Sequence, residues 1–280
     1  MEKSLKKYFL FFLGPTLIAF TIAFIIPFLM GIFLSFARFT TMADIHWAGF
    51  SNYVRAFSNR DFLNALGFSA LFTVVSVIII NVVAFFLALL LTKGYRGTNV
   101  FRTMIFMPNL IGGIVLGYIW QFIINGFLSL FGVTITVDPK YGFWGLVVLT
   151  NWQFIGYMMI IFIAGIQNIP NDVLEAAKID GAGPFMVLRK ITVPLVMPSI
   201  TITLFMTITN SFKTFDQNLA LTAGGPGKST AMVALDIYNT FYSRTGWEGV
   251  GQAKAMMFFI LVVIISLVQL SITRRREVTN

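Results

Sequence analysis

Residues 65–92 read ALGFSALFTVVSVIIINVVAFFLALLLT, a stretch that contains no charged side chain. One helix needs about 20 predominantly apolar residues to cross a bilayer core of about 30 Å. This stretch is long enough, and five others satisfy the same criterion. The six predicted crossings are 8–37, 65–92, 103–124, 141–166, 191–212 and 255–273. The sequence therefore predicts an all-α membrane protein with six transmembrane helices.

The composition agrees with a chain that lipid surrounds. It is 57% hydrophobic and only 11% charged, whereas about 25% of the residues of a soluble domain are charged. The net charge of +9 does not indicate nucleic acid as a partner, because the basic residues lie in short loops between apolar segments. There is no cysteine and His46 is the only histidine, which excludes disulfides and Cys- or His-rich metal sites. The first apolar run exceeds the 7–15 residues of a signal peptide, so an uncleaved helix is expected.

The orientation is predicted from the distribution of charge between the loops. One set of loops, together with both termini, holds 12 basic and 5 acidic residues, a net charge of +7. The other set holds 8 basic and 6 acidic residues, a net charge of +2. Cytoplasmic loops carry an excess of Lys and Arg, so both termini are expected inside. The inner loops lie near 93–102 and 167–190, and the outer loops near 38–64, 125–140 and 213–254.

The predicted spans contain no Asp, Glu, Lys, Arg or His. Ionisable residues inside membranes mark proton relays and ion coupling, so energy conversion within the bilayer is not expected. Residues 222–229, TAGGPGKS, approach a phosphate-binding loop. However, Thr222 replaces the first glycine and Pro226 lacks a backbone N–H. We therefore expect a chain that is not an enzyme, hydrolyses no ATP and binds no cofactor; any driving force enters through a cytoplasmic loop or is absent.

The inner loop 167–190 predicts a short helix. Pro170 and Asp172 suit its first turn, and Gly181 suits a left-handed C-terminal cap. Ala176 and Ala177 would make one side smooth for a close partner, while Glu175 and Asp180 offer charge to a basic side chain. On these grounds alone, it is equally possible that the loop only connects two spans. Beyond the loop, Pro194 and Pro198 are expected to bend the fifth span.

These residues also resemble a known family. Glu175-Ala176-Ala177, Gly181 and the segment Ile191-Thr192-Val193-Pro194 resemble the EAA loop of binding-protein-dependent ABC importers, with Val193 departing mildly from the usual Ile-x-Leu-Pro. Other segments resemble the first of the two permeases in importers of oligosaccharides and glycerol 3-phosphate. They are Gly14-Pro15, Pro27, Ser35-Phe36, Gly49–Tyr53, Arg102 with Pro108, Thr222–Pro226 and Arg274–Val278.

The resemblance implies a type I ABC importer permease bundle with a cytoplasmic coupling helix, in the bacterial cytoplasmic membrane. It implies residues 1–64 as an N-terminal part, 65–273 as the core transmembrane domain and 274–280 as a basic tail. The implied partners are a second homologous permease, an extracellular solute-binding protein and a cytoplasmic ATPase dimer that uses ATP and Mg²⁺. The residues implied in ATPase coupling are Glu175, Ala176, Ala177, Asp180 and Gly181.

A carbohydrate pathway needs amide and hydroxyl partners and an aromatic face, and uncharged polar residues are scarce in these spans. The predicted pathway residues are Asn109, Thr150, Trp152, Gln153, Ser211, Thr214 and Phe215. Hydrogen bonds that hold helices together are the alternative role for each of them. The resemblance implies an oligosaccharide as the solute. A non-sugar solute such as glycerol 3-phosphate, another type of ABC importer, or an ATPase-independent channel or carrier stays open.

Overall fold

The computed structural model of the chain describes residues 2–277, with side chains from residue 11 onward. Residues 278–280, which end the predicted basic tail, lie outside the described residues. The chain forms two compact units. Unit 1 comprises Met1–Phe62 and Ile237–Phe259, and unit 2 comprises Leu63–Asp236 and Ile260–Asn280. Each unit is described by itself.

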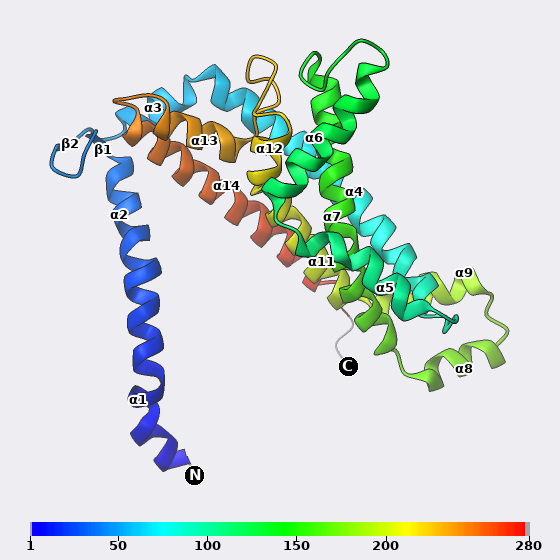
Figure 1. The fold of residues 1–280 in the computed structure, drawn as a ribbon. Helices are drawn as coiled ribbons and strands as arrows, with labels where there is room; N and C mark the ends of the chain where they lie inside the picture. The colour runs from blue at the N-terminus through cyan, green and yellow to red at the C-terminus, as the bar shows by residue number, and fades with distance from the viewer. Residues whose placement is uncertain (1, 278–280) are drawn as a thin grey trace. The chain divides into compact units, whose positions relative to one another are not determined.

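Helices make up most of the described chain (Figure 1). In chain order the elements are α1 (Glu2–Phe20), η1 (Thr21–Ile25), α2 (Ile26–Ser35), β1 (Ala37–Phe39), β2 (Ile45–Trp47), α3 (Ser51–Phe57), α4 (Arg60–Leu91), α5 (Thr98–Phe106), η2 (Met107–Leu110), α6 (Gly113–Ser129), α7 (Pro139–Gln167), α8 (Asn171–Ile179), α9 (Pro184–Val187), η3 (Leu188–Thr192), α10 (Val193–Leu195), α11 (Met197–Phe212), α12 (Asp216–Leu221), α13 (Val233–Tyr242) and α14 (Glu248–Arg274).

Six membrane spans emerge when each bent helix pair counts as one span. Four are continuous helices over Phe11–Ser35, Arg60–Leu91, Pro139–Gln167 and Glu248–Arg274. The other two are bent, by 100° between Thr98–Leu110 and Gly113–Ser129 and by 68° between Pro184–Leu195 and Met197–Phe212. The number of crossings agrees with the sequence prediction, whereas the cytoplasmic position of both termini stays a prediction.

The fifth span bends where its prolines predict. The break lies at Val196, whose φ of −89° and ψ of 1° depart from the α-helix. Pro198 sits in the first turn of α11, where its missing N–H costs no helical hydrogen bond. Pro194 lies in the short helix α10 before the break. The predicted bend is therefore present.

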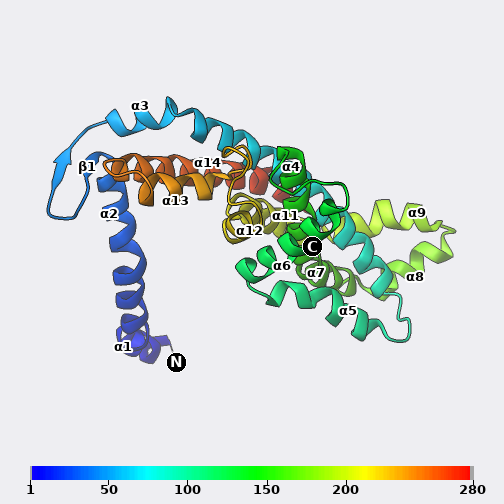
Figure 2. The ribbon, with the colours of Figure 1, turned by 45° about the horizontal axis from the view of Figure 1, so that its top comes forward.

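The third span differs from the single helix predicted over 103–124. It breaks at Gly112, whose ψ of 141° is not helical, just after a 3₁₀ turn that contains Pro108. The following helix, α6, packs on α12 (Figure 2). This contact requires glycine, because a Cβ on Gly113 would lie 2.8 Å from Cβ of Asp216, and one on Gly117 would lie 2.5 Å from Cβ of Ala220. The glycines thus allow α6 to leave the line of α5 and lie against α12.

The core of unit 2 forms around α4 and α7. Ile80 and Ala84 of α4 are buried in one cluster with Met158 and Phe162 of α7. A second close approach joins α7 to α5, because a Cβ on Gly156 would overlap the backbone carbonyl of Ile105. The backbones of α7 and α5 are therefore in direct contact at Gly156. Small residues commonly allow such close packing of helices within membranes.

Unit 1 has a two-stranded hairpin in which Ala37 pairs with Trp47 and Phe39 with Ile45. The amide of Asn52 on α3 holds the start of this hairpin, donating to the carbonyls of Ser35 at 3.0 Å and Ala37 at 2.8 Å. Asn52 is itself 1% exposed. The hairpin is thus attached through its backbone to the helix that follows it.

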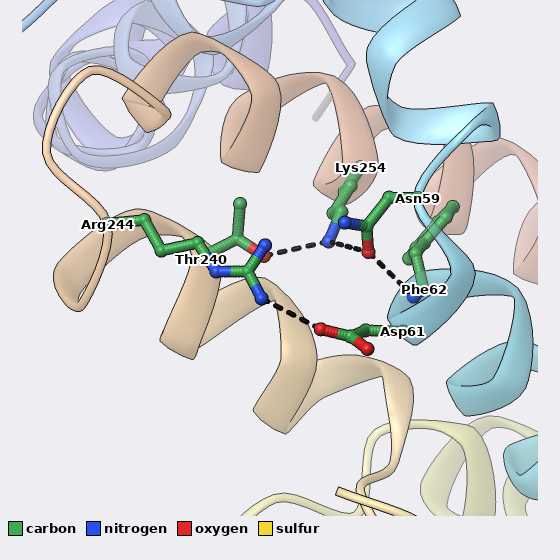
Figure 3. A network of polar contacts seen from close by, with 6 residues as sticks. All are labelled: Asn59, Asp61, Phe62, Thr240, Arg244 and Lys254. Carbon is green, nitrogen blue, oxygen red and sulfur yellow. Dashed lines mark hydrogen bonds and ion pairs between the residues drawn. The ribbon is translucent and has the colours of Figure 1, made fainter.

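Unit 1 also contains a fully buried lysine (Figure 3). Nζ of Lys254, on α14, donates to Oγ1 of Thr240 at 2.8 Å and to Oδ1 of Asn59 at 3.2 Å. It also lies 5.1 Å from the ring centroid of Phe62. Beside it, Arg244 and Asp61 form an ion pair at 2.7 Å. A buried charge is tolerated only when it is hydrogen-bonded or paired, and this network supplies such partners.

Candidate functional site

The predicted helix of loop 167–190 is present as α8, Asn171–Ile179. Pro170 precedes it in an extended conformation, and Asp172 and Lys178 lie in its first and last turns, as its dipole favours. At its end Gly181 has the predicted left-handed conformation, with φ of +74°. Its N–H donates to the carbonyl of Lys178 at 3.1 Å, and the N–H of Ala182 donates to Ala177 at 2.9 Å. This pair of bonds is the Schellman motif, which satisfies the terminal carbonyls of the helix.

The face that α8 turns outward carries both charge and apolar surface. Glu175, Ala176 and Asp180 are exposed, and Ile179 is 86% exposed. Ala177, by contrast, is only 7% exposed. The prediction that the two alanines form one smooth side was wrong, because consecutive helical residues point about 100° apart. Of the two, only Ala176 lies open to a partner.

The inward face of α8 attaches the helix to unit 2. Leu174 packs against the hydrophobic cluster that includes Ile169, and Ala177 is buried on the same side. In both ribbon views α8 and α9 lie at the end of unit 2 remote from α12 (Figures 1 and 2). On α9, Phe185 is 73% exposed and Met186 is 51% exposed. Contiguous exposed apolar groups next to charges are typical of a protein-binding surface.

The predicted solute residues divide into two groups by burial. Thr150, Gln153, Ser211 and Thr214 are 0–5% exposed, so the chain itself covers them. Trp152 is 43% exposed, with its ring 5.5 Å from that of Trp120 in an edge-on arrangement. Asn109 and Phe215 are half-buried. The residues that present surface are thus Asn109, Trp152 and Phe215.

Gln153 has a defined structural role. Its Nε2 donates to the carbonyl of Ile111 at 3.1 Å, immediately before the break of the third span. Its Oε1 accepts a hydrogen bond from Nε2 of Gln217 on α12 at 2.7 Å. Thr214 likewise bonds inside the chain, donating to the carbonyl of Asn210 at 3.2 Å. The bonds of Gln153 join helices, which was the alternative role that the sequence left open, whereas Thr214 bonds only to the end of the helix that precedes it.

The sequence places the residues of α12 in an outer loop and does not identify their role in packing within unit 2. Asn218, which is fully buried, donates to the carbonyl of Thr230 at 2.8 Å and accepts from the N–H of Met232 at 2.8 Å. Gln121 of α6 donates to the carbonyl of Leu221 at 2.9 Å. The adjacent amides Gln217 and Asn218 were the available signal, because buried helix contacts in membranes favour such side chains.

Hydrogen bonds within the loop 222–229 and from Thr230 fix the conformation of this loop. The N–H of Gly224 donates to Oγ1 of Thr222 at 3.2 Å, and the N–H of Gly225 donates to the carbonyl of Thr222 at 2.8 Å. Oγ1 of Thr230 donates to the carbonyl of Gly225 at 2.6 Å. The N–H groups of Gly224 and Gly225 are therefore occupied by the loop itself.

Comparison with known proteins agrees with the multi-pass helical architecture of the chain. The family model described as "Binding-protein-dependent transport system inner membrane component" matches residues 87–278. The probable starch degradation products transport system permease protein AmyD of Thermoanaerobacterium thermosulfurigenes is 42% identical, over 95% of this chain and 94% of that protein. The trehalose/maltose transport system permease protein MalF of Thermococcus litoralis is 30% identical, over 93% of this chain and 92% of that protein.

A solved structure shares the whole fold. A chain of a bacterial ABC transporter involved in the import of the acidic polysaccharide alginate has a TM-score of 0.82 and 21% identity, with 98% of each chain covered. The fold, the family match and the relatives agree with one another. The chain belongs to the family of binding-protein-dependent transport system inner membrane components, as a multi-pass, non-enzymatic permease subunit of a carbohydrate-type ABC importer.

Proposed function

We propose that this chain is one of two permease subunits that move an oligosaccharide into the cytoplasm, powered by a separate ATPase dimer. The observation that carries the proposal is the 42% identity to AmyD over nearly the full length of both chains, since that protein's name specifies starch degradation products. The multiple sugar-binding transport system permease protein MsmF of Streptococcus mutans, 29% identical over 99% of this chain, points to the same class of solute. An ATPase-independent channel or carrier has no support from this family.

The coupling role is proposed for α8. Glu175 and Asp180 offer carboxylates to basic side chains of the ATPase, Ala176 allows close approach, and Ile179 offers an apolar anchor. Ala177 and Gly181 act differently, since Ala177 packs inward and Gly181 closes the helix. ATP and Mg²⁺ act on the ATPase, and this chain receives the resulting movement through α8.

The absence of cysteine allows a direct test of this contact. Single cysteines at Ile179 and at Ala177 differ mainly in exposure, 86% against 7%. In the assembled transporter, Ile179→Cys should crosslink to the ATPase with a short bifunctional reagent, while Ala177→Cys should not. Absence of a crosslink from Ile179→Cys and from Glu175→Cys in an intact complex would contradict the coupling role of α8.

The solute pathway is proposed to involve the exposed side chains Asn109, Trp152 and Phe215, with Thr150, Gln153, Ser211 and Thr214 supporting them from within the subunit. The broken third and fifth spans favour this region, since transporter sites lie beside discontinuous helices. A binding protein delivers the solute in this proposal. Its support is a fold neighbour, with a TM-score of 0.81, solved with an alginate pentasaccharide-bound periplasmic protein.

Glycerol 3-phosphate is the competing solute. The sn-glycerol-3-phosphate permease UgpA of Agrobacterium fabrum is 28% identical over 79% of this chain, a lower identity over a shorter stretch than AmyD. The test is uptake of radiolabelled maltotriose by cells that express the whole transporter, with each unlabelled solute as competitor. Competition by malto-oligosaccharides but not by glycerol 3-phosphate is expected, and the reverse pattern would overturn the assignment of the solute.

A further inference from the structure

A polar cavity of about 510 Å³ lies in unit 2 where α4 ends, α5 begins and α7 ends. Its polar lining comes from Thr92, Tyr95, Thr98, Asn99, Arg102 and Gln167. The connection between α4 and α5 lies at the same end of unit 2 as α8 and α9 (Figure 1). By the distribution of charge this end is the cytoplasmic one. The solute pathway and α8 involve none of the lining residues.

The segment around the cavity carries three basic residues, of which only Arg102 lines the cavity itself. Lys93, Arg96 and Arg102 lie between residues 92 and 103, which include no acidic residue. Lys93 and Arg96 are exposed. No carboxylate from another element lines the cavity. The electrostatic environment therefore favours an anion.

Arg102 has an unused donor at this site. One guanidinium nitrogen, Nη2, donates to the carbonyl of Leu91 at 2.7 Å. The Nε atom of the same side chain is buried and has no hydrogen-bond partner among the described residues. A buried N–H without an acceptor is unfavourable, and a phosphate oxygen is the acceptor that guanidinium groups bind best.

Apolar side chains continue from the cavity along α5. Val100, Phe101, Met104 and Met107 are each 56–61% exposed, at spacings that place them on one side of the helix. A free inorganic anion would make no apolar contact with this surface. A molecule with a phosphate at one end and acyl chains at the other matches both the cavity and the apolar stripe.

We propose that this cavity binds the phosphate headgroup of an anionic phospholipid from the cytoplasmic leaflet. The phosphate accepts a hydrogen bond from the guanidinium of Arg102, the basic side chain that lines the cavity. Lys93 and Arg96 attract it from outside the lining, and the acyl chains lie along Val100, Phe101 and Met104. Basic pockets between transmembrane helices on the cytoplasmic side recognise lipid headgroups in this way. The lipid would then join the ends of the second, third and fourth spans.

The test is native mass spectrometry of the assembled transporter, titrated with phosphatidylglycerol or with phosphatidylcholine of the same acyl chains. The first variant, Lys93→Gln with Arg96→Gln, removes two exposed charges without touching the bond to Leu91. The matched control, Lys140→Gln with Lys213→Gln, removes two exposed charges from the predicted outer loops. Arg102→Gln removes the guanidinium, and its circular dichroism spectrum and melting curve show whether it folds.

We expect wild type and control to retain phosphatidylglycerol at least threefold more than phosphatidylcholine. The Lys93/Arg96 variant should lose most of this preference, and folded Arg102→Gln should lose all of it. Equal retention of both lipids by wild type, or equal losses in control and variant, would overturn the proposal. So would displacement by millimolar inorganic phosphate, which indicates a free anion site. Failure of an intact complex to retain the lipid would show that another subunit covers the cavity, with the same consequence.

Discussion

Oε1 of Gln153 accepts a hydrogen bond from Nε2 of Gln217 at 2.7 Å, and this contact joins α7 to α12. Because Gln153 also donates to the carbonyl of Ile111, one side chain connects three parts of unit 2. The third span breaks beside Ile111, so its broken end is held by α7. The bend is thus held in place by hydrogen bonds of a side chain on a neighbouring helix.

Gln153→Leu should destabilise the subunit, since it removes two hydrogen bonds and leaves Ile111 and Gln217 without this partner. The expected cost is about 1–2 kcal/mol, at about 0.6 kcal/mol or somewhat more for each bond within a membrane. The measurement is the thermal unfolding midpoint of the detergent-solubilised transporter. Trp152→Ala, which alters a side chain that is 43% exposed, should lower transport with a much smaller change in the midpoint. Equal midpoints for Gln153→Leu and wild type would contradict the structural role.

Gly156→Ala should damage the packing of α7 on α5. Its added methyl group would overlap the backbone carbonyl of Ile105, and backbone is not free to move aside. Overpacking of this kind costs about 1–3 kcal/mol, so a lower unfolding midpoint and a lower yield of assembled transporter are expected. The matched control is Gly67→Ala on α4, where a Cβ has nothing within 4 Å. It should be neutral or stabilising by up to about 1 kcal/mol. A control as unstable as Gly156→Ala would refute the explanation from close approach.

Gly181→Ala should weaken coupling while it leaves membrane insertion intact. Gly181 has φ of +74°, and a side chain there strains the turn that ends α8 by about 1–2 kcal/mol. We expect transport to fall at least threefold, and Gly181→Asp to abolish it. Gly183→Ala is the control, since Gly183 has φ of −68° and an added Cβ would have nothing within 4 Å. The measurements are uptake and the amount of chain in the membrane. Normal uptake in Gly181→Asp would count against the coupling role.

Lys254→Met should destabilise unit 1. The substitution keeps most of the apolar stem but removes the ammonium that donates to Thr240 and Asn59. Loss of a buried charged donor leaves its acceptors unsatisfied, at about 1–3 kcal/mol. Lys140→Met, at an exposed position, should change stability by about 0.5 kcal/mol or less. Thermal unfolding of the two variants distinguishes them, and a Lys254→Met protein as stable as Lys140→Met would disprove the role of the network.

Several features were predictable because they follow local rules. The six apolar stretches follow from the thickness of the bilayer, the bend near Pro194 and Pro198 from the missing N–H of proline, and the turn at Gly181 from its freedom to adopt positive φ. Each depends only on residues that are close in the sequence.

Other features depend on packing between distant segments and could not be predicted. Glycine is frequent in straight transmembrane helices, so Gly112 and Gly113 did not indicate a break without knowledge that α12 lies against α6. The burial of Ala177 depends on which side of α8 meets the core. Lys254 looked like a residue of an outer loop, but α14 begins at Glu248 and carries it into a buried network.

The measurement that tests the central claim most directly is ATP-dependent accumulation of maltotriose in proteoliposomes. The complete transporter, with its solute-binding protein, should concentrate the sugar only on the side of the membrane where the ATPase lies and ATP is supplied. The same permease pair without the ATPase should show no accumulation above the external concentration. Accumulation by the pair alone would contradict the account, because the chain would then contain its own source of energy.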